Sequence, residues 1–598
     1  MLSSAVLRVN GRTELVIDGR CVPAAAYTTY FEERSRYEDF VEAGYRIFFV
    51  NVSMTALPIN SAVTGFTPIR LGVFEDPDRP DYSEFEDAVR KILRACPDAY
   101  IFPRIYVSMP RWWTEQHDGE CIDTPKGGRR EFLGSEVFRR DGAELLRRIV
   151  SHIKAADYAP RIAGWQLCGG QTQEWFHHDL CGYPAPTVVR GFRRYMEEEY
   201  GVKNAPVPNF EALRGEGVCV DENAKRYVEF GNVCVAKSLA HFAKTVKEET
   251  EHKQVVGAFY GYVFEKATVN VGSCALRTLL NSPHLDFFSS PNAYNHARRF
   301  GIDWADMLPV DAIKRHGKLA FIECDIRTYL TMGVQESRPG AYPEDIYPTA
   351  KPGMPSVWSG PPTPELSRAA LRKCFAHQLT KASGIWWFDM WGGWYDDPLL
   401  MQALAEMRRI QERTVTRANR DFAAQVAVIA DEQAKENLCA KHAADRAVSA
   451  NRIVTGNAGA PFDGEMVEGI ADYLHKYKAV IFPSPIPSPA GERAMALCRE
   501  RGVPYLTATL AHPFLTLEEQ VEFLKEAGVH LYAMGGDVVY VGNGYAALHS
   551  ETGGEKRLFL PAAHHVTPLF GAENVHVSGR EITFLLEACD TALFQIDE

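Results

Sequence analysis

The stretch at residues 318–330, KLAFIECDIRTYL, decides the fold, because four residues typical of a β-strand, LAFI, lead directly into a glutamate, Glu323. It is the seventh of eight short apolar runs, which alternate with longer segments of helical spacing. This alternation predicts parallel βα units, and eight such units close into a (β/α)8 TIM barrel. The eight runs lie at residues 22–27, 46–52, 99–107, 162–167, 255–260, 285–290, 319–322 and 384–388.

The pattern changes twice after the barrel. From about residue 425, the runs QVAVIADE, YKAVIFPSP and VPYLTATL alternate with helical stretches and predict a small doubly wound α/β sheet. Beyond residue 535, turn residues separate strands without helical spacing, which predicts an antiparallel β domain. We therefore expect a barrel with short N-terminal strands at 1–415, a flavodoxin- or amidotransferase-like structural or oligomerising domain at 416–534, and a C-terminal β domain at 535–598.

Composition excludes several classes of function. The formal charge of -12 over 598 residues argues against a nucleic-acid partner, which needs a clustered basic surface. No run is long and apolar enough for a membrane, and the N-terminus lacks the pattern of a secretory signal. Thirteen cysteines without a CxxC pair fit free thiols in a reducing compartment, so we expect a cytoplasmic protein. No spacing matches a zinc site or a dinucleotide loop, and neither a metal nor a cofactor is predicted.

Two glutamates carry the predicted chemistry. Active-site residues of TIM barrels stand at the carboxyl ends of strands, where Glu323 is placed to attack an anomeric carbon. The fourth run continues as RIAGWQLCGGQTQEWF, and Glu174 is its nearest carboxylate. Trp175 beside it is expected to form an apolar wall that keeps the acid protonated. The alternative for each glutamate is structural, an ion-paired strand end for Glu323 and a solvated loop for Glu174.

Further residues near strand ends are candidates for contacts with a sugar. The eighth run, GIWWFDMWGGWYDD, is rich in aromatic rings, which suit the apolar faces of pyranoses. A tyrosine after the sixth run is expected to hydrogen-bond the nucleophile, and each candidate has a purely structural alternative. The candidates are Asn51, Arg111, Trp113, Asn292, Tyr294, Trp391 and Trp394.

The motifs IAGWQL, FIECD and WWFDMWGGW resemble those of the retaining glycosidases of clan A. That clan places its acid/base after strand four and its nucleophile at the end of strand seven. The order of barrel, α/β domain and β domain is similar to family 42 β-galactosidases and related three-domain β-galactosidase and β-mannosidase families. The resemblance implies a homotrimer with exo-action on short β-linked oligosaccharides, galactosides first and mannosides second.

The chain departs from these families at one motif. They carry Asn-Glu two residues after the GWQ of strand four, where this chain has Gly169 and Gly170. One interpretation is that Glu174 has taken over as acid/base, with Gln171 replacing the asparagine that holds the sugar 2-hydroxyl. Another is a sugar-binding pseudoenzyme without acid catalysis. A third is an isomerase or lyase with a sugar-phosphate site at Gly392-Gly393.

Overall fold

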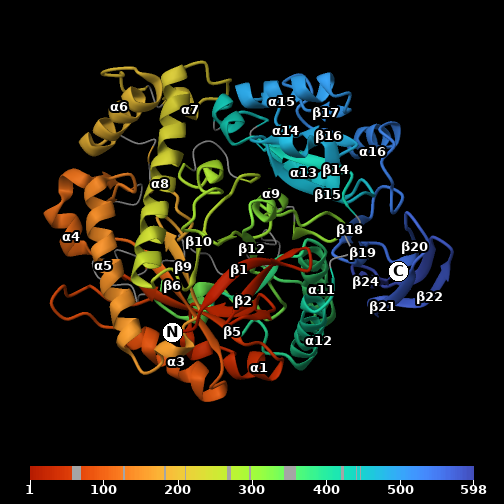
Figure 1. Cartoon of the computed structure of the whole chain (residues 1–598), viewed down its shortest axis with the longest axis horizontal. Helices are drawn as coiled ribbons and strands as arrows, with labels where there is room; N and C mark the ends of the chain where they lie inside the picture. Colours follow the sequence, from red (N-terminus) through yellow and green to blue (C-terminus); the bar gives the residue numbers. More distant parts are fainter. Residues whose placement is uncertain are drawn as a thin grey trace.

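The computed structural model describes the chain except for residues 57–68, 125–127, 179, 181–183, 209–210, 266–270, 295–297, 342–358, 419–422, 440, 445 and 598. Three regions follow one another along the chain (Figure 1). A barrel ringed by helices comes first, a small α/β unit follows, and antiparallel sheets end the chain. Within the described residues, no helix is long and apolar enough to span a membrane.

Eight parallel strands close the barrel in the order of the sequence. Each overlaps one predicted apolar run, so the predicted TIM barrel is confirmed. Nearly every strand residue is buried, as expected for parallel strands covered on both faces. The strands are β4 (Ala25–Thr29), β5 (Ile47–Ser53), β6 (Tyr100–Val107), β9 (Gly164–Gly169), β10 (Val255–Phe259), β11 (Phe287–Ser289), β12 (Leu319–Cys324) and β13 (Gly384–Asp389).

Aromatic rings pack the inside of the barrel. Phe49 lies 5.3 Å from Phe102 and 5.2 Å from Phe321, measured between ring centroids. Trp386 lies 5.6 Å from Phe49 and closes the layer from β13. The centre of the barrel is therefore a core, and polar groups lie toward the carboxyl ends of the strands.

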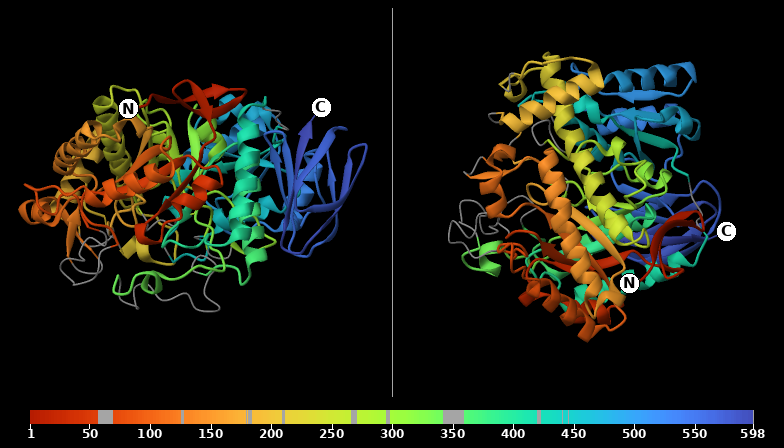
Figure 2. Two further views of the ribbon diagram at one scale, coloured as in Figure 1. Left: turned by 90° about the horizontal axis from the view of Figure 1, so that it is seen from below. Right: turned by 60° about the vertical axis from the view of Figure 1, so that its left-hand side comes forward.

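Helices cover the outside of the barrel (Figure 2), and the longest are α5 and α8, which pack on each other. α5 begins where the Ser135 hydroxyl accepts the backbone N–H of Phe138, and the Asp221 carboxylate caps α8 in the same way. The helices are α1 (Tyr37–Glu42), α3 (Ser83–Ala95), α4 (Arg111–Gln116), α5 (Glu136–Ala155), α6 (Pro186–Tyr200), α7 (Glu211–Arg214), α8 (Glu222–Glu249), α9 (Val310–Arg315), α10 (Val334–Ser337), α11 (Pro364–Thr380) and α12 (Pro398–Val415).

Two small sheets accompany the barrel. β1 (Ser4–Val9), β2 (Arg12–Ile17) and β3 (Arg20–Val22) form the predicted N-terminal strands, and Asn10 and Gly11 turn the chain with positive φ. Backbone bonds from Leu2 to Ile162 and from Ser4 to Lys253 tie this sheet to the residues before β9 and β10. It therefore lies at the amino ends of the strands, away from the predicted site. β7 (Cys121–Asp123) and β8 (Arg129–Glu131) form a hairpin after β6.

The α/β unit has a parallel sheet in the order β15-β14-β16-β17. Its strands β14 (Val426–Ala430), β16 (Ala479–Phe482) and β17 (Tyr505–Thr507) lie in the three predicted runs, whereas β15 (Phe462–Met466) was not predicted. One face of β14 packs against α14 and α15, and the other joins the core shared with the barrel. Its helices are α13 (Ala447–Gly456), α14 (Ile470–Tyr473), α15 (Pro489–Glu500) and α16 (Leu517–Glu526).

The C-terminal strands form two antiparallel sheets with the orders β18-β19-β24-β21 and β20-β23-β22. They lie beside α11, where Arg372 pairs with Asp590 and the ring of His377 stacks on Tyr540 (Figure 1). The strands are β18 (Val538–Gly542), β19 (Tyr545–His549), β20 (Gly554–Phe559), β21 (His565–Phe570), β22 (Ala572–Ser578), β23 (Glu581–Leu586) and β24 (Thr591–Asp597).

Candidate active site

Glu323 is the fifth residue of β12 and is 2% exposed. Its neighbour Cys324 points outward, because the Cys324 sulfur lies 3.2 Å from the sulfur of Cys374 on α11. Since successive strand residues face opposite sides, Glu323 points into the barrel. Its Oε2 atom is buried without a hydrogen-bond partner in the described part of the chain. A buried carboxylate oxygen without a partner is costly, which marks this position as a candidate for function.

The surroundings of Glu323 set its protonation. Burial raises the pKa of Glu323 well above its usual range, and the negative charges of Asp325 and Glu174 raise it further. The positive charges of Arg104 and Arg327 oppose this rise. The two predicted carboxyl groups, Glu323 and Glu174, therefore interact electrostatically across the barrel mouth.

Glu174 lies in the loop after β9, where two hydroxyl groups hold its half-buried carboxylate. Tyr262 donates to Oε1 at 2.5 Å, and Thr172 donates to Oε2 at 2.6 Å. The Phe176 ring packs edge-on against Tyr262, with 5.1 Å between centroids. These contacts direct the Glu174 side chain toward the residues after β10.

The backbone of this loop explains the missing Asn-Glu motif. The Trp175 N–H donates to the Gly169 carbonyl at 2.7 Å, so the chain turns back on the end of β9. A Cβ at Gly169 would lie 2.7 Å from the Trp175 ring, and a Cβ at Gly170, with φ of +65°, would lie 2.4 Å from the Phe176 carbonyl. Neither asparagine nor glutamate fits at these positions, because the turn requires glycine.

The loop corrects two expectations. The Trp175 ring does not form a wall beside the acid, since it is 0% exposed and its Nε1 donates to the Leu167 carbonyl at 3.2 Å. It packs against Phe242 of α8 on the far side of β9, and the aromatic ring that contacts Glu174 is that of Tyr262. Gln171 is exposed, whereas the unpredicted Gln173 is buried and points into the barrel. Gln173 stands directly before Glu174, and this adjacency was the available signal.

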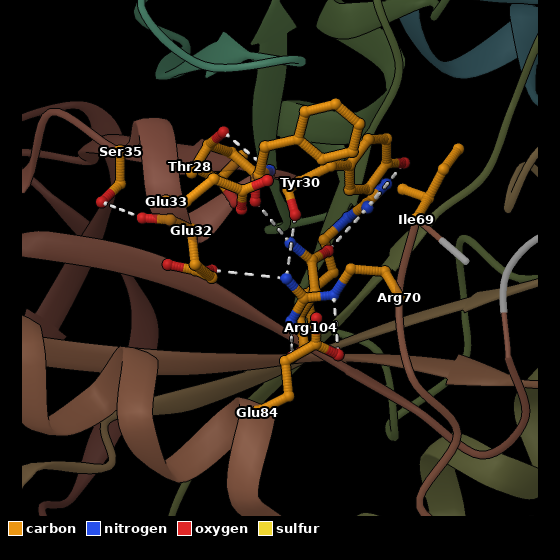
Figure 3. A network of polar contacts seen from close by, with 12 residues as sticks. Thr28, Tyr30, Glu32, Glu33, Ser35, Ile69, Arg70, Glu84 and Arg104 are labelled. Atoms are coloured by element: carbon orange, nitrogen blue, oxygen red, sulfur yellow. Dashed lines mark hydrogen bonds and ion pairs between the residues drawn. The ribbon is translucent and has the colours of Figure 1, made fainter. Parts of the chain in front are cut away.

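Arg104 on β6, also not predicted, organises the centre of the site. Its Nε donates to Gln166 Oε1 at 3.0 Å, and its Nη1 lies 3.1 Å from Asn51 Oδ1, 2.9 Å from Gln173 Oε1 and 3.2 Å from the Tyr30 hydroxyl. Figure 3 shows Arg104 beneath Tyr30. A lone arginine in the apolar run YIFPRIYV was the sequence signal for this residue. Asn51, which was predicted to contact sugar hydroxyls, is buried, and its side chain accepts from Arg104 and donates to the Thr29 carbonyl.

The residues after β11 divide into two roles. Asn292 is buried and donates to the Trp304 carbonyl at 3.1 Å and to Asp306 at 2.9 Å, so its amide fixes neighbouring loops. Burial and then the charges of Asp325, Glu174 and Glu323 raise the pKa of Tyr294, which places Tyr294 near both predicted carboxylates. No hydrogen bond joins Tyr294 to Glu323 among the described residues.

The aromatic residues after β13 lie near the site. The Trp391 ring is 6% exposed and lies 5.8 Å from the Tyr30 ring. Trp394 is fully buried beneath the Arg327 guanidinium, 4.7 Å from the ring centroid, and its Nε1 has no hydrogen-bond partner among the described residues. Asp389 holds the turn between them by accepting the N–H of Trp394 at 2.9 Å.

The same turn bears on the sugar-phosphate interpretation. The Gly392 N–H donates to the Asp389 carbonyl at 2.9 Å, and the Gly393 N–H donates to the Asp389 carboxylate at 3.0 Å. Both amides are used, and a carboxylate beside them repels an anion. The geometry therefore disfavours a phosphate site here.

Arg111 and Trp113 lie on α4, and no contact among the described residues brings them to Glu323. Arg111 is exposed and pairs with Glu115 at 2.7 Å. Trp113 is 1% exposed, donates to Asp141 at 2.9 Å and stacks on His117. These contacts fit the structural alternative, because each side chain already has its partners within the outer layer. No group of His, Cys, Asp and Glu suited to a metal ion occurs among the described residues.

Solved structures with this three-part fold include family 42 glycoside hydrolases, so the resemblance in fold is confirmed. The β-galactosidase Gan42B of G. stearothermophilus has a TM-score of 0.63 at 10% identity over 100% of both chains. The β-galactosidase of Bacillus circulans sp. alkalophilus has a TM-score of 0.62 at 13% identity over 96% of this chain and 99% of that one. The exo-carrageenase GH42 of Bacteroides ovatus has a TM-score of 0.56 at 12% identity over 100% and 86%.

These identities establish the fold alone. No protein-family model matches the chain, and no curated protein sequence matches it.

Proposed function

We propose that this protein is a retaining exo-β-glycosidase with Glu323 as nucleophile and Glu174 as acid/base. One observation carries the proposal: a buried carboxylate on the seventh barrel strand has an unpartnered oxygen and interacts electrostatically with a second carboxylate after the fourth strand. Retaining glycosidases need two carboxyl groups in these roles. Galactosides are the first substrates to test and mannosides the second.

In the first step, ionised Glu323 attacks the anomeric carbon while Glu174 gives a proton to the leaving oxygen. Burial and the charges of Asp325 and Glu174 favour the neutral form of Glu323, whereas the charges of Arg104 and Arg327 favour the ionised form that attacks. Because two negative charges repel, the pair holds one proton, and the proposed first step uses the form in which that proton is on Glu174. When Glu323 becomes an ester its charge disappears, so Glu174 can ionise and activate water for the second step. The hydroxyl donors Tyr262 and Thr172 support that ionised base.

The pair Gln173-Glu174 takes the place of Asn-Glu in this proposal. Gln173 replaces Gln171 as the amide expected near the sugar 2-hydroxyl, because only Gln173 points into the barrel. The sugar rests against Trp391, with Tyr294 beside the two carboxylates. A homotrimer, a cytoplasmic address, and an oligomerising role for the α/β domain are part of the same proposal.

Changing the two glutamates tests their roles. Glu323→Gln should lower kcat on nitrophenyl β-glycosides by about 10⁴-fold or more, the scale of losing a nucleophile. Glu174→Gln should cost about 10²- to 10⁴-fold on substrates with poor leaving groups and much less on dinitrophenyl glycosides, which need little protonation. NMR identifies the product anomer that forms first and so shows whether the anomeric configuration is retained. Azide should restore turnover of Glu174→Ala, with a β-glycosyl azide as the product.

Glu465→Gln is the matched control, since Glu465 is a buried carboxylate paired with Arg315 at 2.9 Å in the α/β unit. It should keep wild-type kcat. Undiminished turnover in a Glu323 or Glu174 variant removes that residue from the mechanism, and formation of the inverted anomer removes the double displacement.

A sugar-binding pseudoenzyme is the second candidate function. Gly169 and Gly170 occupy the usual acid motif, and two hydroxyl donors on Glu174 favour its ionised form over an acid. This candidate predicts that the wild type binds sugars without hydrolysing them. Turnover that disappears in Glu323→Gln eliminates it.

A further inference from the structure

Tyr30 stands directly after β4 and is 8% exposed. Its hydroxyl oxygen accepts two hydrogen bonds, from Arg104 Nη1 at 3.2 Å and from Gln173 Nε2 at 2.6 Å. The Gln173 amide has a fixed orientation, because its Oε1 accepts from Arg104, which carries only donors. Tyr30 is therefore an acceptor in both bonds.

This arrangement leaves the phenol hydrogen of Tyr30 for a third partner. A phenol carries one hydrogen, and two donors already occupy the acceptor positions of its oxygen. Within the described residues, no acceptor is bonded to that hydrogen. A buried donor without an acceptor costs free energy, so the site is complete only when a further oxygen atom is present.

The neighbours of Tyr30 indicate where that oxygen lies. The charge of Glu323 acts on the Tyr30 hydroxyl, and the Trp391 ring lies 5.8 Å from the Tyr30 ring. The hydroxyl therefore lies within electrostatic range of the predicted nucleophile, and the Tyr30 ring lies beside the predicted aromatic platform. Burial raises the pKa of Tyr30 to about 12, so the hydroxyl stays protonated across the neutral range.

Hydrogen bonds also fix the backbone of Tyr30. The buried Arg70 donates to the Tyr30 carbonyl at 3.0 Å and to the Asn51 carbonyl at 2.8 Å, and thus joins the ends of β4 and β5. Glu32 and Glu84 balance the Arg70 charge at 3.4 and 3.6 Å (Figure 3). Arg70 therefore fixes the backbone of Tyr30 relative to the end of β5.

We propose that Tyr30 determines specificity by donating its phenol hydrogen to one hydroxyl oxygen of the sugar bound at Glu323. The proposal rests on the proposed glycosidase function and adds a contact to its site. A sugar hydroxyl accepts this hydrogen and donates its own elsewhere, so a donor at one fixed point discriminates between epimers that present or withhold an oxygen there.

Tyr30→Phe tests the contact with little change in shape. The variant should lose about 10-fold or more in kcat/KM on the best nitrophenyl glycoside, because one hydrogen bond to substrate is lost and the donors of Arg104 and Gln173 lose their acceptor. The 2-, 3-, 4- and 6-deoxy forms of that glycoside identify the partner hydroxyl. Wild type should discriminate against one deoxy form by a factor that Tyr30→Phe does not show.

Tyr45→Phe is the matched control. Tyr45 is a buried tyrosine that accepts from Trp387 Nε1 at 2.8 Å and donates to the Leu404 carbonyl at 3.3 Å, beneath α12 and outside the site. It should keep wild-type kcat/KM even if its Tm falls. Equal losses for Tyr30→Phe on all four deoxy glycosides and the parent would show a structural role and overturn the proposal.

Sugar binding separates this proposal from the proposed function. A titration of tryptophan fluorescence with galactose, mannose and glucose measures sugar binding in the absence of turnover, and it can be compared between wild type and Tyr30→Phe. Turnover in wild type with unchanged kcat/KM in Tyr30→Phe overturns the Tyr30 contact alone. Binding weakened by Tyr30→Phe without turnover overturns catalysis alone, and the absence of both binding and turnover overturns both.

Discussion

At the scale of single residues, Glu323 combines a functional position with a cost to the fold. Its carboxyl group is buried, and Asp325 and Glu174 add negative charge nearby. A group whose pKa is raised by folding stabilises the native state at low pH, and that contribution is lost as the pH rises through the native pKa. Glu323 therefore weakens the protein most where its ionised form is needed for attack.

Glu323→Gln should make the protein more stable than wild type at pH 8, with Tm higher by on the order of 2 °C. The glutamine amide cannot ionise, so the variant avoids the loss of stability that wild type undergoes when Glu323 ionises with rising pH. The difference in Tm should shrink toward about pH 3.5, where the wild-type carboxyl is largely protonated in both the folded and the unfolded state. Thermal unfolding followed by circular dichroism at several pH values measures it.

Glu115→Gln serves as the control, because Glu115 is exposed on α4. Its Tm should differ from that of wild type by the same small amount at each pH. A Tm difference for Glu323→Gln that stays constant or falls with rising pH would contradict the raised pKa.

The sequence predicted the two glutamates but not the residues that organise them. Glu323 comes directly after the four apolar residues of the seventh run, so the sequence pattern predicted its position near the carboxyl end of β12. Arg104, Tyr30 and Gln173 were not predicted, because each acts through contacts between strands that are distant in sequence. Trp175 was assigned by adjacency to Glu174, yet the left-handed backbone at Trp175, with φ of 60°, turns its ring behind β9.

At the scale of elements, the loop after β9 is built from unusual backbone conformations. Gly170, Thr172, Gln173 and Trp175 all have positive φ, between 55° and 69°. This conformation costs free energy in residues other than glycine, so contacts with the surrounding residues must stabilise it. The chain leaves β9 at Gly169 and Gly170, and the loop then bends back so that Gln173 and Glu174 lie beside the end of that strand.

Gly170→Ala should disrupt this loop. Its Cβ would lie 2.4 Å from the Phe176 carbonyl, in addition to the strain of the left-handed backbone, and we expect a loss of about 2–3 kcal/mol. A displaced Glu174 should also lower kcat by about 10²-fold, because catalytic groups tolerate little misplacement. Urea unfolding and nitrophenyl glycoside assays measure the two effects.

Gly502→Ala separates the clash from the backbone strain. Gly502 also has φ of +65°, but nothing lies within 4 Å of a Cβ there. It should cost about 1 kcal/mol and leave kcat unchanged. Equal losses of stability in the two variants would show that the contact with Phe176 is unimportant.

The strands show which elements of the fold the pattern of apolar residues can predict and which it misses. All eight barrel strands overlap apolar runs, because parallel strands covered on both faces must be apolar throughout. β15, with the sequence FDGEM, was missed because its Asp463 and Glu465 are polar. They are accommodated by partners from elsewhere in the chain, Lys381 at 3.7 Å from Asp463 and Arg315 at 2.9 Å from Glu465, which no local pattern reveals.

At the scale of the whole molecule, a charged cluster joins the barrel to the α/β unit. Arg277 of the barrel pairs with Glu432 of the α/β unit at 3.2 Å and with Glu229 of α8 at 3.1 Å. Burial, and then neighbouring carboxylates, raise the pKa of Glu436 well above its usual range and that of Glu468 to about 7. Arg277 thus neutralises an interface rich in buried acids.

Arg277→Met should lower the stability of the two-part assembly by about 3–5 kcal/mol, because it leaves buried carboxylates without their partner. The loss should be larger at pH 8 than at pH 5.5, since Glu436 and Glu468 gain charge as the pH rises through their raised pKa values. Differential scanning calorimetry at the two pH values measures the size of the stability loss and shows whether the loss grows with pH.

Arg557→Met is the comparison, because Arg557 forms an exposed pair with Glu555 at 3.1 Å. Such a surface pair contributes about 0–1 kcal/mol, and its removal should give little change at either pH. A loss in Arg277→Met no larger than this would mean that the interface does not depend on the ion pair.

The turn at Gly169 and Gly170 has a consequence for recognising homologues. A search profile that demands Asn-Glu behind the strand-four tryptophan passes over this chain, although a glutamate returns to that strand end four positions later. The text pattern Gly-Gly, two further residues, then Gln-Glu-Trp describes both the bend and the acid that it delivers. Homologues found with that pattern should keep tryptophan at the position of Trp175, because its ring packs against Gly169.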